Sequence, residues 1–120
     1  MSLDPEVTTT AVAPTLTTII TRDVRRWGLG TLQVQNLDPS QTFSGFLRRK
    51  VAGSLGFALV SLGDFLSIQP AGSVDADGNP TDSVTADLDL EGSAEIEFVG
   101  KMSGAGGDVS WALRMSSVKP

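Results

Sequence analysis

Few residues of this chain could carry out chemistry. The sequence of 120 residues has no cysteine and no histidine, and these two residue types supply most activated nucleophiles, general bases and metal ligands in proteins. Serine is plentiful, but Lys50, Lys101 and Lys119 are the only lysines that could activate one. We therefore expect no enzyme activity and no cofactor. Without cysteine the fold must be held by packing and not by disulfide bonds.

Two short segments resemble ligand-binding loops. Residues 75–79 (DADGN) place carboxylates at alternate positions, as a calcium loop begins. However, Pro80 stands where an EF-hand loop requires glycine, and Ala86 stands where it requires a bidentate glutamate. Residues 104–107 are rich in glycine, but no Lys-Ser/Thr pair follows them as in a phosphate-binding loop. We interpret both segments as connections between strands and expect no metal site.

The acidic residues are concentrated in Val84–Phe98 (VTADLDLEGSAEIEF), where apolar and polar residues alternate on both sides of Glu91–Ser93. Alternation with a period of two predicts strands with one buried face and one wet face. A three-residue turn would pair apolar residues with one another, whereas a slip of one residue would bring each side chain to the other face. We therefore predict a hairpin whose outer face opposes like charges, Asp89 with Glu95 and Asp87 with Glu97.

This acidic face has two interpretations. It is either solvated, with like charges that cost about 0.2–1 kcal/mol per opposed pair, or it binds a basic partner. In the first case, Asp87→Asn combined with Glu97→Gln should stabilise the isolated domain.

Arginine and tryptophan, which are enriched at the energetic centres of interfaces, mark two further candidate contacts. In the cluster Arg25-Arg26-Trp27, the tryptophan either closes one end of the core or anchors a neighbouring protein. Arg48 and Arg49 end a predicted strand, and they are either solvated or meet the acidic hairpin of another subunit.

Charge is distributed unevenly along the chain. Residues 22–50 hold six basic residues against two acidic ones, and residues 51–108 hold ten acidic residues against one lysine. This asymmetry either orients neighbouring subunits head to tail or disappears when folding interleaves the two signs. An acidic chain with a formal charge of −5 is not expected to bind nucleic acid. It also has no apolar run long enough to span a membrane, and its first residues do not form a secretory signal.

Turn-forming residues divide the chain into short strands without helical spacing. We predict an all-β fold, an antiparallel immunoglobulin-like sandwich of about seven or eight strands, with a closed barrel as the structural alternative. Residues 1–14 are expected to form an extended N-terminal arm, and residues 15–120 the sandwich domain. The closing strand should bury Trp111, and a bulge near Gly45 should reconcile the facing of its strand. Besides the hairpin, we expect strands at residues 15–21, 31–36, 42–50, 57–60, 65–69 and 108–115.

In pattern and order the chain resembles the small immunoglobulin-like capsid decoration, or cement, proteins of tailed bacteriophages. The resemblance rests on residues 30–36 (GTLQVQN), 42–49 (TFSGFLRR), 64–73 (DFLSIQPAGS), 84–98 and 107–115 (GDVSWALRM). It implies a non-enzymatic virion protein on the capsid surface, bound in many copies to the major capsid protein or another virion protein. We also expect a homo-oligomer, and from charge and hydropathy we expect no binding to nucleic acid or membrane. No binding residues follow from the resemblance.

Three alternatives remain open. A tail or neck component of the same kind of particle would need the same properties. An immunoglobulin-like module of a cell-surface protein would bind a ligand or cation, and its melting would then depend on calcium. An enzyme is disfavoured by the absence of histidine and cysteine.

Overall fold

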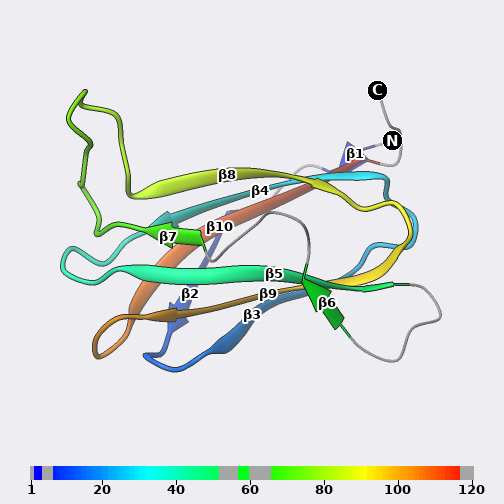
Figure 1. The fold of residues 1–120 in the computed structure, drawn as a ribbon, viewed down its shortest axis with the longest axis horizontal. Coiled ribbons are helices and arrows are strands. Elements are labelled where there is room, and N and C mark those ends of the chain that lie inside the picture. Colours follow the sequence, from blue (N-terminus) through cyan, green and yellow to red (C-terminus); the bar gives the residue numbers. More distant parts are fainter. Residues whose placement is uncertain (1, 4–6, 52–56, 60–65, 117–120) are drawn as a thin grey trace.

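The computed structural model describes residues 2–3, 7–51, 57–59 and 66–116, and its architecture is all-β (Figure 1). No helix able to cross a membrane occurs in this part of the chain. The strands, in chain order, are β1 (Ser2–Leu3), β2 (Thr8–Val12), β3 (Thr17–Asp23), β4 (Leu29–Asn36), β5 (Phe43–Val51), β6 (Phe57–Leu59), β7 (Leu66–Ile68), β8 (Ser83–Asp89), β9 (Ser93–Met102) and β10 (Gly107–Ser116).

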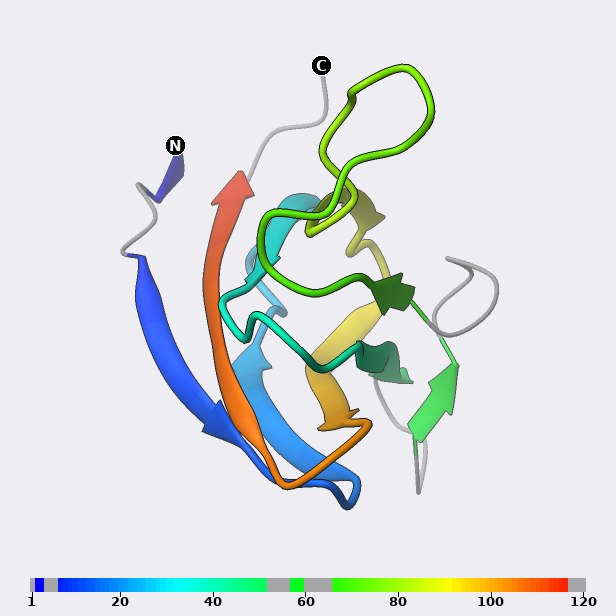
Figure 2. The same cartoon turned by 90° about the vertical axis from the view of Figure 1, so that its left-hand side faces the viewer.

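The strands form two antiparallel sheets that pack face to face (Figures 1 and 2). The first sheet has the order β1-β10-β4-β8. Strands β1 and β2 both pair with the same edge of β10, β1 with its C-terminal end and β2 with its N-terminal half. The second sheet has the order β3-β9-β5-β6. Strands β6 and β7 both pair with the same edge of β5, at different residues along it. The sheets therefore offer eight strand positions, which confirms the predicted antiparallel sandwich.

The connectivity differs from that of immunoglobulin domains. In those domains several consecutive strands pair within one sheet. Here the chain changes sheet between β2 and β3, β3 and β4, β4 and β5, β7 and β8, β8 and β9, and β9 and β10. Such alternation between two sheets is the arrangement of a jelly roll, another solution for two packed antiparallel sheets.

The prediction of an acidic hairpin is wrong, because the chain changes sheet between β8 and β9. Strands β8 and β9 do not pair with each other, because β8 pairs with β4 in the first sheet and β9 lies between β3 and β5 in the second. The turn at residues 90–92 carries the chain from one sheet to the other, with Gly92 at a φ of 77°. The predicted facing is nevertheless correct, since Leu88, Leu90 and Ile96 are all buried.

Residues 8–12, within the expected arm, lie along the edge of the first sheet as β2 (Figure 2). Val12 is 2% exposed and belongs to the core. The side chain of Thr10 accepts a hydrogen bond of 3.0 Å from Nε1 of Trp111. The division between residues 1–14 and 15–120 remains a prediction, although the described part of the first segment completes the sandwich in this structure.

The core is centred on Phe43, whose ring packs 5.8 Å from that of Phe98 between centroids. Gly45 and Gly100 lie opposite each other on β5 and β9, and a Cβ atom at Gly100 would come within 2.4 Å of the Phe43 ring. Gly45 is therefore part of a close-packed site and not of the predicted bulge. The β5 register is continuous there and shifts only between Lys50 and Val51.

A buried amide closes one end of the sandwich. Asn36, at the end of β4, is fully buried, and its Nδ2 donates to the carbonyl oxygens of Gln41 (2.7 Å), Gln69 (3.1 Å) and Ile68 (3.3 Å). Its Oδ1 accepts the backbone N–H of Asp38 at 2.9 Å. One side chain thus joins the end of β4, the β4–β5 loop and the end of β7.

The loop that follows is ordered by two further side chains. Asp38 Oδ1 accepts the backbone N–H groups of Ser40 (2.9 Å) and Gln41 (2.8 Å). The Ser40 bond is the main cause of a lowered pKa at Asp38, partly opposed by desolvation. Gln41 Oε1 accepts the N–H groups of Gly104 and Gly106. The β4–β5 and β9–β10 loops are therefore held together by side chains that satisfy backbone groups.

We expect Asn36→Ala to lower the free energy of unfolding by about 2–4 kcal/mol, because it leaves buried carbonyl oxygens without a donor. Urea denaturation followed by tryptophan fluorescence measures this change. The matched control is Gln35→Ala at the neighbouring exposed position, where the change should stay within about 0.5 kcal/mol. Equal losses in the two variants would contradict the role assigned to the buried amide.

Candidate interaction surfaces

The acidic residues of β9 face basic residues of β5. Arg48 lies opposite Glu97, and Lys50 lies opposite Glu95. The Arg48 guanidinium donates through Nε (2.6 Å) and a terminal nitrogen to Glu97 Oε1. The Glu97 side chain is 12% exposed and that of Arg48 is 37% exposed. Folding has therefore interleaved the two signs on the outer face of the second sheet, and the predicted opposition of Glu97 to Asp87 does not occur.

The other two acids of the predicted hairpin belong to the first sheet. Asp87 lies opposite Thr31, whose hydroxyl donates to Asp87 Oδ1 at 3.1 Å, and Asp89 lies opposite Leu29. Both acids are exposed. Asp89 Oδ1 also accepts the backbone N–H of Glu91 at 3.1 Å. The four predicted acidic residues consequently lie on two different sheets and form no continuous surface.

The cluster Arg25-Arg26-Trp27 lies in the crossing from β3 to β4. Both arginines are exposed, whereas Trp27 is half-buried and packs against the core. The Asp23 carboxylate caps the turn by accepting the Arg25 N–H at 3.1 Å, and it lies 3.7 Å from the Arg25 side chain. Of this cluster, Arg25 and Arg26 are exposed to solvent, and Trp27 packs against the core.

Arg49 takes a different position from Arg48. It lies opposite Ile96 on β9, and its side chain donates to the hydroxyl of Ser93 at 3.4 Å. Both predicted arginines of β5 thus contact residues of the adjacent strand.

The polar loop of residues 70–82 projects from one end of the sandwich (Figure 1). Asp75 Oδ1 accepts the N–H groups of Asp77 and Asn79, each at 2.9 Å, and the Asn79 bond is the main cause of a lowered pKa at Asp75. Among the described residues, no group of three or more acidic side chains is placed to hold a metal ion. The carboxylate of Asp75 orders its own loop.

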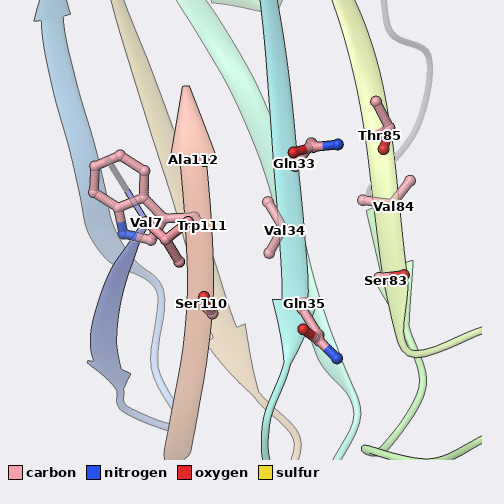
Figure 3. A pocket seen from close by; sticks show the side chains of 10 residues that line it. All are labelled: Val7, Gln33, Val34, Gln35, Ser83, Val84, Thr85, Ser110, Trp111 and Ala112. Atoms are coloured by element: carbon pink, nitrogen blue, oxygen red, sulfur yellow. The ribbon is translucent and has the colours of Figure 1, made fainter. Parts of the chain in front are cut away.

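A surface that the sequence analysis did not identify is the outer face of the first sheet. A shallow hollow of about 260 Å³ lies across β10, β4 and β8, and Figure 3 shows the side chains that line it. A second hollow of about 130 Å³ adjoins it and shares Gln33 and Ala112 with it. In the sequence, the signal that could have indicated this surface is the run of uncharged polar residues at outward positions of these strands. The first hollow is lined by Val7, Gln33, Val34, Gln35, Ser83, Val84, Thr85, Ser110, Trp111 and Ala112.

The open side between the sheets is covered by the N-terminal strand and by an arginine. Trp111, inward-facing as predicted, is 7% exposed. The Arg22 guanidinium of β3 lies 5.7 Å from the centroid of its ring, within the range of cation–π attraction. Since Thr10 of β2 bonds the same ring, Trp111 contacts an edge strand of each sheet.

No protein-family model matches the chain, and no curated protein sequence matches it. Solved structures are similar in fold. One, described under the words "Bacillus endospore appendages form a novel family of disulfide-linked pili", has a TM-score of 0.50 and 11% identity, covering 97% of this chain and 87% of that chain. At this identity the likeness shows a shared fold alone.

Two weaker likenesses involve viral proteins. The SPBc2 prophage-derived protein YomS has a TM-score of 0.44 and 13% identity, covering 92% of this chain and 93% of that chain. A chain of the infectious bursal disease virus Gx strain has a TM-score of 0.37 and 13% identity, covering 95% of this chain and 32% of that chain.

The pairing of Glu97 with Arg48 reverses the expected effect of neutralising that acid. We expect Glu97→Gln to destabilise the protein by about 0.5–1 kcal/mol, with a smaller loss at high salt, because a partly exposed ion pair is lost. Asp87→Asn serves as the control and should have little effect. Denaturant midpoints at low and high salt measure both variants, and stabilisation by Glu97→Gln would contradict the assigned pair.

Proposed function

We propose that this protein is a non-enzymatic structural subunit of a tailed-phage virion, a decoration protein that binds the capsid lattice in many copies. Its fold is compatible with this role, since jelly rolls occur in viral capsid domains. Because a fold does not by itself assign a function, the proposal depends on a feature of the surface.

That feature is the way in which β2 is attached. Its five residues pair along the outer edge of β10 and have no strand on their other side within the described residues. Residues 13–16, which lead from β2 to β3 in the other sheet, are all exposed. A short edge strand on an exposed connection is suited to exchange, because the same segment of a neighbouring copy would make the same backbone bonds.

Exchange of β2 would link copies through the same contacts that β2 makes within a single chain. Val12 would enter the core of the neighbour, and Thr10 would accept the bond from the neighbour's Trp111, as both do within the single chain. A head-to-tail exchange closes into a ring when the rotation between copies allows it. A ring of subunits is a suitable arrangement for bridging neighbouring capsid proteins around a symmetry axis.

Contact with the capsid is assigned to the exposed arginines of the β3–β4 turn. Arg25 and Arg26 lie at an end of the sandwich, with Trp27 packed behind them. Exposed guanidinium groups fit an acidic surface of the major capsid protein or of another virion protein. A tail or neck location in the same kind of particle would use the same assembly element.

A removable cross-link tests the exchange of β2. Ala11 and Asp108 are direct partners on β2 and β10, and both are exposed. Since the chain has no native cysteine, the Ala11→Cys, Asp108→Cys double variant can form one disulfide, which fixes β2 to its own chain. We expect this variant to assemble like the wild type when reduced. After oxidation in dilute solution, where each β2 pairs with its own chain, it should remain monomeric when concentrated, as measured by light scattering.

The single variants Ala11→Cys and Asp108→Cys, each blocked with an alkylating reagent, control for the substitutions themselves. Equal assembly of the oxidised and reduced double variant would contradict exchange of β2. A wild-type chain that stays monomeric at every concentration would contradict a self-assembling subunit.

A further inference from the structure

The outer face of the first sheet has a charge pattern that is complementary to itself. Three rows of outward side chains run across β10, β4 and β8, as the strand registers define. The rows are Arg114–Thr31–Asp87, Ala112–Gln33–Thr85 and Ser110–Gln35–Ser83. In the first row, Arg114 thus lies on one side of β4 and Asp87 lies at the same level on the other side. The exposed Asp89 continues the same face of β8, one row beyond, opposite Leu29.

These two charges do not neutralise each other within the chain. Arg114 and Asp87 are separated by two strand spacings, about 10 Å, and both are exposed. Among the described residues neither forms an ion pair, and Asp87 accepts a hydrogen bond only from the hydroxyl of Thr31. On the second sheet, by contrast, Arg48 and Glu97 are direct partners and do form an ion pair.

We propose that this face binds a second copy of the chain, related by a two-fold axis that runs parallel to β4. Rotation about this axis exchanges the two sides of β4 and preserves the level along the strand. Arg114 of one copy then faces Asp87 of the other, and the reverse contact forms at the same time. One substitution on a single chain therefore changes two contacts, as in any isologous interface.

The uncharged rows fit the same arrangement. Gln33 lies on the axis and meets its counterpart, and an amide is self-complementary because it carries both donors and an acceptor. Thr85 of one copy faces Ala112 of the other. Ala112, at 6% exposed, is a lining residue of both hollows, so the larger side chain of Thr85 meets the recessed part of the face.

The area of the face determines how strongly two copies are expected to bind each other. Three strands and three rows span roughly 300 Å² per copy at ordinary strand and residue spacings, which is less than half of the roughly 800 Å² that a stable complex buries per partner. The contact should therefore be weak between free chains and effective between copies that another interaction already holds close together. It does not depend on the proposed virion role or on the exchange of β2.

Charge reversal tests the contact between Arg114 of one copy and Asp87 of the other. Arg114→Asp and Asp87→Arg should each lower the self-association constant about tenfold, since each turns two attractive contacts into repulsive ones. An equimolar mixture of the two variants restores both contacts in a 1:1 complex and should return the association constant to the wild-type value. Sedimentation velocity at low salt and up to about 1 mM protein, a range suited to weak complexes, measures these constants.

Two variants with the same changes in net charge serve as controls. Lys101→Asp lies on the outer face of the second sheet and Asp77→Arg lies in the 70–82 loop, both at exposed positions. Neither should change self-association by itself, and their mixture should behave like the wild type. A mixture of Arg114→Asp and Asp87→Arg that associates no better than its components would overturn the proposal.

The position of the axis can be tested separately. Gln33→Cys creates the only thiol of the chain, and a short bis-maleimide reagent should couple two such chains rapidly, because Gln33 lies next to its own counterpart. Thr21→Cys, exposed on the outer face of the second sheet, should couple only slowly. Equal rates for the two variants would overturn a two-fold axis along β4.

Discussion

The buried amide of Asn36 is the interaction on which much of this structure depends. A chain that alternates between two sheets must cross the end of the sandwich repeatedly, and each crossing removes backbone polar groups from their strand partners. A buried carbonyl oxygen without a donor costs about 1–3 kcal/mol. At Asn36 one side chain satisfies three carbonyl oxygens and one N–H group, while Gln41 extends the network to the β9–β10 loop.

Local sequence patterns predicted the faces of the strands better than their partners. Period-two alternation correctly identified Leu88, Ile96 and Trp111 as buried. It could not determine that Leu88 and Ile96 belong to different sheets, because a short turn containing glycine can join strands within a sheet or across two sheets. The decisive information lies in non-local pairings, such as β8 with β4, which no local pattern specifies.

The candidate surfaces changed for the same reason. Glu97 was expected to oppose another acid, and it pairs with Arg48, which is 49 residues away in the chain. The sequence did contain a signal for Asn36. This polar residue follows Leu32 and Val34 in the alternation that places every second residue of β4 on the buried face. The complementary positions of Arg114 and Asp87 were not accessible to sequence reasoning, because they follow from the order of three strands that are distant in the chain.

The two sheets have different surface character, and this difference organises the proposed function. The second sheet pairs its charges internally, as Arg48 does with Glu97. The first sheet carries both the exchangeable β2 edge and the face on which Arg114 and Asp87 are separated. Both proposed contacts between copies therefore use the first sheet, and the proposed contact with the capsid uses the arginines of the β3–β4 turn.

The most direct test of the central claim is electron cryo-microscopy of tailed-phage capsids, stripped of their minor proteins and incubated with the purified chain. The account predicts additional density that repeats at symmetry-equivalent positions over the capsid surface, with room for one sandwich domain per copy. Density confined to a portal or tail position, or capsids that remain bare at saturating protein, would contradict it.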